Sequence, residues 1–136
     1  MAVARGGDRG RLRDLSDRLV RLHKTLLDFE RAAYEATHGR VRSSGELLEL
    51  LLHHEQFLWL RSLSGVMARI DEALDDPQAG RPDVEKFFRE TYGLLRSGRG
   101  GVFESRYHTA LQESPDVVMA HADVVKLLPL KESDHA

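Results

Sequence analysis

The sequence predicts an all-α fold, an antiparallel helical bundle of four principal helices with additional short helices. Alternating apolar and polar residues of strand type are nearly absent from the chain. Over a long N-terminal segment, apolar residues recur in steps of three and four, at Leu12, Leu15, Leu19, Leu22, Leu26, Phe29, Ala33 and Ala36. This spacing places all eight side chains on one face of a single helix. Brief loops between the predicted helices favour antiparallel neighbours.

The composition is that of one ordinary globular domain. A chain of 136 residues with 41% hydrophobic and 31% charged residues can bury roughly two-thirds of the surface that its unfolded form exposes. The absence of cysteine excludes disulfides, thiolate metal sites and a cysteine nucleophile. No secretory signal is visible, and the apolar runs are too short to span a bilayer. We therefore expect a soluble cytoplasmic protein.

The first helix is expected from about residue 9 to His38, with Gly39 as its left-handed stop. Residues 1–8 are expected to form a flexible basic N-terminus. The segment 1–13 carries four arginines against one acidic residue, at Arg5, Arg9, Arg11, Arg13 and Asp8. It has no aromatic platform and no helix-turn-helix spacing, so a solvated tail is favoured over nucleic-acid binding.

The middle of the chain predicts a short helix followed by a long one. Residues 43–46 (SSGE) have the form of a capping box, which begins a short helix over 47–52. His53 and His54 mark a kink or a break. The next helix then continues from about Glu55 to Leu74, with an apolar face at Leu60, Leu63, Met67, Ile70 and Leu74.

Three further segments complete the domain, which we place at residues 9–130. The loop 75–82 contains two prolines and a glycine, and Asp83 can cap the next helix, whose apolar residues are Val84, Phe87, Phe88, Leu94 and Leu95. A flexible turn at 97–101 precedes a helix with Val102, Phe103, Tyr107 and Leu111 on its inner side. Ser114 and Pro115 begin the last helix, which Pro129 ends, and residues 131–136 are expected to fray.

A half-polar stripe follows the leucine ladder of the first helix, at Ser16, Val20, His23, Leu27, Glu30 and Tyr34. The helix over 55–74 offers a matching stripe at Phe57, Arg61, Ser64, Ala68 and Asp71. Antiparallel pairing brings Tyr34 near Phe57, Glu30 near Arg61, and His23 near Asp71. We expect a Glu30–Arg61 ion pair and a His23–Asp71 hydrogen bond, both partly buried.

This polar stripe has a structural and a functional interpretation. Buried pairs fix helix register while adding little net stability, because desolvation cancels much of the Coulomb gain. A carboxylate beside an imidazole can also serve acid/base or metal chemistry. His121, on the apolar side of the last helix, could meet His23 and complete an iron, zinc or manganese site. Such metals need three or four ligands, so the structural interpretation is favoured and no cofactor is predicted. The candidate residues are His23, Glu30, Tyr34, Arg61, Ser64, Asp71 and His121.

No catalytic motif is complete. The Glu-x-x-His pattern occurs once, at Glu35 and His38, whereas a diiron bundle needs two copies on separate helices. The serines at 62 and 64 lack the strand-to-helix setting of a nucleophile elbow, and the segment 98–101 lacks the lysine of a phosphate loop. A non-enzymatic protein is therefore favoured.

Three strings of the sequence resemble a family of small all-helical bacterial proteins of unknown function, over roughly residues 15–128. They are LHKTLLDFERAAYEATHGRV, LLELLLHHEQFLWLRSLSGVMARIDE and RYHTALQESPDVVMAHADV. The residues that match the family pattern are His23, Lys24, Glu30, Arg31, Tyr34, Glu35, His38, Gly39, Trp59, Leu60, Arg61, Asp71, Pro115, Asp116 and His121. The resemblance implies an all-helical bacterial domain and implies no activity.

The sequence favours a binding or interaction module that forms a homodimer or binds another protein. Helix 47–52 is apolar almost all round, more than one side of a small bundle can bury. The expected interface residues are Leu47, Leu48, Leu51 and Leu52, supported by Leu50. The alternative is a metal- or small-molecule-binding bundle that uses the polar stripe.

Overall fold

The structure, a computed structural model, describes residues 6–96 and 101–128. These residues form seven α-helices joined by short turns and contain no β-strand, which confirms the predicted all-α class. The helices are α1 (Gly6–His38), α2 (Ser44–His53), α3 (Glu55–Leu58), α4 (Arg61–Asp75), α5 (Arg81–Arg96), α6 (Val102–Glu113) and α7 (Pro115–Val125). No helix among them combines the length and the apolar composition needed to cross a membrane.

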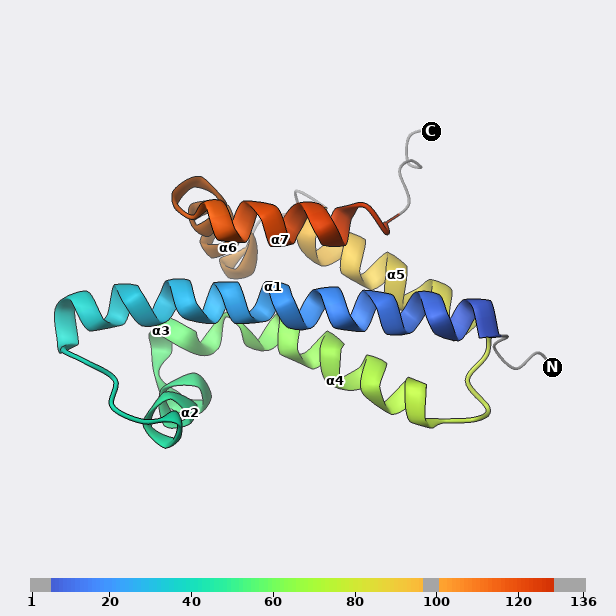
Figure 1. Cartoon of the computed structure of the whole chain (residues 1–136), viewed down its shortest axis with the longest axis horizontal. Helices are drawn as coiled ribbons and strands as arrows, with labels where there is room; N and C mark the ends of the chain where they lie inside the picture. Colours follow the sequence, from blue (N-terminus) through green and yellow to red (C-terminus); the bar gives the residue numbers. More distant parts are fainter. Residues whose placement is uncertain (1–5, 97–100, 129–136) are drawn as a thin grey trace.

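The 33-residue helix α1 is the central element of the fold. It packs against α3, α4, α5 and α7. In Figure 1, α4 returns along one side of α1 in the opposite direction, and α7 runs along the other side. Helix α6 packs on α5 and α7, whereas α2 packs mainly on α3. The core therefore lies between one face of α1 and the helices that cover it.

The leucine ladder forms the centre of that core for most of its length. Its buried members are Leu12, Leu15, Leu19, Leu22 and Leu26. Each contributes about 1.5–3 kcal/mol relative to an exposed side chain. Phe29 is half-buried, and Ala33 and Ala36 are exposed. The shared face predicted for the ladder is therefore buried only up to Leu26, because the last turns of α1 extend beyond the helices that cover it.

The N-terminal end of α1 is bound more closely to the rest of the protein than expected. The helix begins at Gly6, so residues 6–8 are not the flexible segment that was predicted. Asp8 is buried and pairs with Arg11 at 3.5 Å and with Arg81 at 3.3 Å. Arg9 donates hydrogen bonds to the main-chain oxygens at the end of α4. Arg9 and Arg11 are thus not a solvated tail; residues 1–5 lie outside the described residues.

Local stop and start signals acted as predicted around α2. Gly39 follows α1 with a φ of 87°, in the left-handed region that favours glycine. Ser43 Oγ accepts a hydrogen bond from the main-chain N–H of Glu46 at 3.1 Å, and the Glu46 carboxylate accepts one from Arg42 N–H at 2.8 Å. The expected serine cap is therefore present, with its return bond one residue earlier than in a capping box.

The break at His53–His54 is present, but the uninterrupted helix expected from Glu55 to Leu74 is not. Trp59 and Leu60 form a turn that separates α3 from α4. The neighbouring rings of Tyr34 and Phe57, 5.9 Å apart, match the expected pairing at this end. Beyond Phe57 the turn changes which side chains face α1, with the consequences described below.

The C-terminal half follows its predicted signals with two differences. Helix α5 begins at Arg81, and Asp83 caps it from within the first turn by accepting a hydrogen bond from Gly80 N–H at 2.8 Å. Ser114 Oγ accepts from Val117 N–H at 3.2 Å, as expected for the start of α7. Val102 is 69% exposed, so its predicted inner position was wrong. The turn at 97–100 and the tail after residue 128 lie outside the described residues.

Candidate functional site

Glu30 is the buried centre of the polar stripe. The residue is 4% exposed and accepts hydrogen bonds from Trp59 Nε1 at 2.8 Å and Gln56 Nε2 at 3.0 Å. Arg106 Nη1 lies 3.5 Å from the same carboxylate oxygen that Trp59 contacts. Gln56 also donates to the main-chain oxygen of Glu30. A carboxylate removed from water in this way is stabilised by the donors that replace its hydration.

The short helix α3 and the turn after it bring these donors to Glu30. His54 ends α2 through its main-chain N–H, which donates to Leu50 O at 2.8 Å. The same residue begins α3, because its Nδ1 accepts from Gln56 N–H at 3.1 Å. In the neutral ring the proton therefore sits on Nε2. This junction fixes Gln56, and the following turn directs Trp59 towards Glu30.

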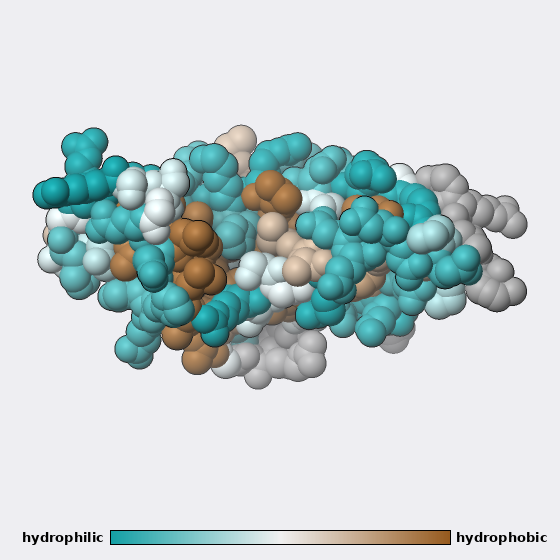
Figure 2. All heavy atoms as spheres, turned by 90° about the horizontal axis from the view of Figure 1, so that it is seen from below, coloured by the Kyte–Doolittle hydropathy of each residue, from teal (hydrophilic) through white to brown (hydrophobic). Residues whose placement is uncertain are grey.

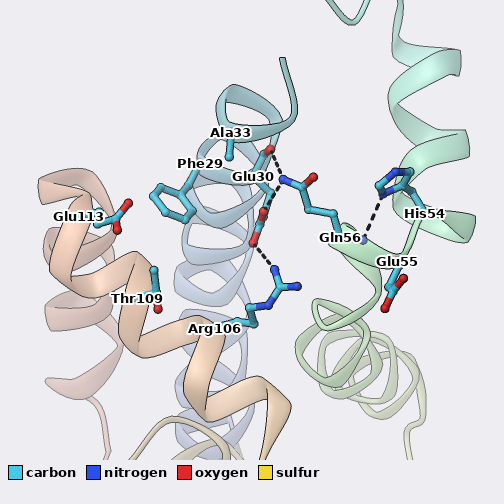
Figure 3. Close-up of a pocket in the computed structure, with 9 residues that line it drawn as sticks. All are labelled: Phe29, Glu30, Ala33, His54, Glu55, Gln56, Arg106, Thr109 and Glu113. Carbon is cyan, nitrogen blue, oxygen red and sulfur yellow. Dashed lines mark hydrogen bonds and ion pairs between the residues drawn. The ribbon is translucent and has the colours of Figure 1, made fainter. Parts of the chain in front are cut away.

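A pocket of about 470 Å³ opens over Glu30. Figure 3 shows side chains that reach it from α1, from the α2–α3 junction and from α6. Phe29 and Ala33 form its apolar part, and Arg106 extends from α6 towards Glu30. We call this cavity the Glu30 pocket. The residues that line it are Phe29, Glu30, Ala33, His54, Glu55, Gln56, Arg106, Thr109 and Glu113.

The predicted Glu30–Arg61 ion pair was wrong. Because α3 and α4 are separated, Trp59 rather than Arg61 faces Glu30. Arg61 is exposed and donates instead to the main-chain oxygen of Leu52 at 2.6 Å, near the end of α2. Ser64 Oγ donates to the main-chain oxygen of Arg61 at 3.4 Å. Arg61 therefore joins α4 to α2 rather than to the first helix.

The predicted His23–Asp71 hydrogen bond was also wrong. Asp71 is exposed on α4. His23 Nε2 is buried and has no hydrogen-bond partner in the described part of the chain. Burial lowers the pKa of His23 below its ordinary value of 6.5, because desolvation disfavours the charged ring. The side chain is consequently a neutral group with one unsatisfied nitrogen.

Tyr34 belongs to an aromatic group beside the Glu30 pocket. Its ring stacks on His38 with centroids 4.2 Å apart and meets the edge of His54 at 5.2 Å. His54 also contacts Phe57, at 6.1 Å. These contacts hold the end of α1 against the α2–α3 junction, so Tyr34 has a packing role here.

His121 pairs with Tyr107, which the sequence had suggested only as an inner residue of its helix. Tyr107 Oη and His121 Nδ1 share a hydrogen bond of 2.6 Å. Burial raises the pKa of Tyr107, whereas burial, and secondly the charge of Arg96, lower the pKa of His121. A smaller cavity of about 250 Å³ adjoins this pair.

The seven predicted residues do not form one constellation. Within residues 6–96 and 101–128, the bond from Ser64 Oγ to the main-chain oxygen of Arg61 is the one side-chain hydrogen bond that joins two of them. No three histidine, aspartate or glutamate side chains in the same ranges could together hold a metal ion. The partners of Glu30 that the sequence did not reveal are Gln56, Trp59 and Arg106. A signal did exist, since a glutamate at a core position needs donors from neighbouring elements.

The second predicted feature, the leucine-rich helix α2, has no buried residue. Leu47, Leu50 and Leu51 are half-buried against the core, whereas Leu48 and Leu52 are 53% and 44% exposed. Residues four apart lie on the same face of a helix. Figure 2 shows a column of hydrophobic side chains at the end of the molecule where α2 lies in Figure 1. We call the face formed by Leu48 and Leu52 the leucine face.

No protein-family model, no curated protein and no solved structure matches this chain.

Proposed function

We propose that this chain is a non-enzymatic helical interaction module that self-associates through the leucine face of α2. The bacterial origin and cytoplasmic location expected from the sequence are part of this proposal. The observation that carries it is that α2 contains five leucines in ten residues and buries none of its residues. Exposed apolar side chains gathered on one element favour a binding partner, because their contact with water is unfavourable.

The spacing of the exposed leucines suits a second copy of the chain. In a two-fold symmetric dimer, two α2 helices would lie antiparallel, with Leu48 of each copy against Leu52 of the other. The negative first turn, which holds Glu46, would then lie near the last turn of the other helix, which holds His53. Antiparallel helices also place opposite ends of their dipoles side by side. The leucine face of one copy is thus complementary in spacing and charge to the leucine face of a second copy.

The test is the oligomeric state of the wild-type chain and of Leu48→Lys, measured by light scattering at tens of micromolar. We expect a dimer for the wild type and a monomer for Leu48→Lys, because the substitution places a charge in the apolar contact. Met119→Lys is the matched control, since Met119 is 68% exposed on α7, away from α2. A monomeric wild type, or equal dissociation by both substitutions, would contradict the proposal.

The Glu30 pocket supports a second candidate function, the binding of a small molecule. A volume of about 470 Å³ lies within the range of about 300–1,000 Å³ that ligand sites occupy. Iron, zinc or manganese binding remains part of this alternative, and elemental analysis of untagged protein tests it. For organic ligands, a small-molecule screen by melting temperature is the first test, with the fluorescence of Trp59 as the local readout.

A further inference from the structure

We propose that the Glu30 pocket binds a small organic cation, an ammonium or guanidinium group attached to an apolar body. This inference rests on the second candidate function and names its ligand class. Three properties of the pocket support it: the charge of its lining, the long contact between Glu30 and Arg106, and an apolar wall.

The lining of the pocket carries an excess of negative charge. Its charged residues are three carboxylates, Glu30, Glu55 and Glu113, and one guanidinium, Arg106, which leaves a formal charge of −2 with His54 neutral. Glu55 and Glu113 form no ion pair with any residue that the structure describes. A cation entering the pocket is therefore attracted, and an anion of the same size is repelled.

Glu30 is held in place by neutral groups, so its charge remains available. Trp59 and Gln56 donate hydrogen bonds without bringing a positive charge. The only cation beside Glu30 among the described residues is Arg106, at 3.5 Å and with a side chain that is 43% exposed. The contact is long and its arginine end is open to solvent, which weakens it, whereas the Glu30 end is buried. A ligand cation can therefore take the position of the Arg106 guanidinium while that side chain swings into solvent.

The wall beside Glu30 suits the apolar body of such a ligand. Phe29 and Ala33 come from the same helix as Glu30 and lie on the pocket side of α1. In Figure 3 the Phe29 ring stands between Glu113 and Glu30. An aromatic face within a few ångströms of a cation adds a favourable electrostatic contact. Phenethylammonium combines the required charge with a ring of suitable size.

The experiment compares three probes of the same shape and different charge: phenethylammonium, 2-phenylethanol and phenylacetate. Binding is measured by calorimetry and by the fluorescence of Trp59, the only tryptophan in the chain, whose indole N–H contacts Glu30 directly. We expect saturable binding of phenethylammonium, weakened by salt, with the neutral probe weaker and phenylacetate weakest.

Arg106→Gln gives the decisive comparison. Because Arg106 competes for Glu30, we expect its removal to tighten phenethylammonium binding about two- to fivefold, the scale of a weak ion pair. Glu55→Gln and Glu113→Gln change exposed side chains and should each weaken binding. Asp71→Asn, an exposed acidic position on α4 outside the lining, is the matched control and should leave affinity unchanged.

Two results would overturn the inference. Preferential binding of phenylacetate that Arg106→Gln abolishes would make the pocket an anion site and leave the small-molecule function intact. No binding of phenethylammonium at millimolar concentration would also overturn it. In that case hits in the melting screen would retain the second candidate function, whereas a screen without hits would remove both. The oligomeric state is measured separately and does not depend on either result.

Discussion

Two polar residues on the same stripe of α1 have different surroundings. Glu30 is surrounded by donors from Gln56, Trp59 and Arg106. His23, two turns earlier, has a buried nitrogen without a partner in the described part of the chain. A buried polar atom without a hydrogen bond costs about 1–3 kcal/mol. Glu30 and His23 thus lie on the same stripe of α1, but only Glu30 has hydrogen-bond partners that compensate for its burial, whereas the burial of His23 lowers the stability of the protein.

The surroundings of His23 predict a stability that depends on pH. Burial lowers the pKa of His23 in the folded state, so below pH 6.5 the unfolded chain binds protons that the folded chain does not. Stability is therefore complete above the unfolded pKa and falls as the pH decreases towards the folded pKa. We expect His23→Leu to raise the free energy of unfolding by about 1 kcal/mol at neutral pH and to reduce this pH dependence.

Urea unfolding between pH 7.5 and 5 measures both effects. Part of the slope should persist in His23→Leu, because the pKa of His121 is lowered in the same direction. If the variant keeps the full slope of the wild type and gains no stability at neutral pH, His23 is not the unsatisfied group that we describe.

At the residue scale, the sequence predicted where a polar side chain lies on its helix better than it predicted which residues bind that side chain. Helical periodicity placed Glu30 at the edge of the core, where it lies. Its donors could not be predicted, because Gln56, Trp59 and Arg106 lie 26, 29 and 76 residues away along the chain. The pairing of Glu30 with Arg61 required an unbroken helix, and the single turn after Leu58 was enough to place Trp59 rather than Arg61 beside Glu30.

At the scale of elements, helix ends that depend on local chemistry were predictable. Gly39, Ser43 and Ser114 act within a few residues of their own position, and such signals are readable from the sequence. The division between α3 and α4 contains neither glycine nor proline. Trp59, which lies in the turn between α3 and α4, donates a hydrogen bond to Glu30 of α1. A boundary without a glycine, a proline or a side-chain cap gives no local signal in the sequence.

At the junction between α2 and α3, the adjacent residues His53 and His54 are expected to differ in how much they contribute to stability. His54→Ala removes the ring nitrogen that accepts from Gln56 N–H, and the loss of a helix cap costs about 1 kcal/mol. His53 is exposed and has only a long contact of 3.6 Å with Glu49. We expect His53→Ala to change the free energy of unfolding by less than about 0.5 kcal/mol.

Urea unfolding of the two variants under identical conditions makes this comparison. Because Gln56 also donates to Glu30, His54→Ala should additionally change the fluorescence of Trp59 in the folded state. Equal stabilities for the two variants would show that the His54 ring does not cap α3.

At the scale of the whole molecule, α1 organises the core and the other helices cover it. The ladder from Leu12 to Leu26 was predictable from spacing alone. The exposure of Ala33 and Ala36 was not, since it depends on how far the covering helices reach along α1. Whether a position on an apolar stripe is buried is decided by other segments of the chain.

Adjacent residues on α1 test this central role. Leu19 is fully buried and Val20 is 53% exposed. We expect Leu19→Ala to lower the free energy of unfolding by about 2–5 kcal/mol, because it leaves a cavity in the core. Val20→Ala should cost less than about 0.5 kcal/mol. Thermal or urea unfolding measures both, and a small loss for Leu19→Ala would indicate that α1 is not the centre of the fold.

The central position of α1 also governs the order of events while the ribosome makes this protein. The apolar side of α1 is complete once residue 38 has been added, yet α7, which covers it along one side, ends at Val125. At about 5–20 residues per second, synthesis of α7 is complete roughly 4–17 s later. During this interval α3, α4 and α5 are made and can pack on α1, but the side of α1 that contacts α7 still lacks its cover. Chaperones that recognise apolar segments therefore have their clearest opportunity to bind before α7 has been made.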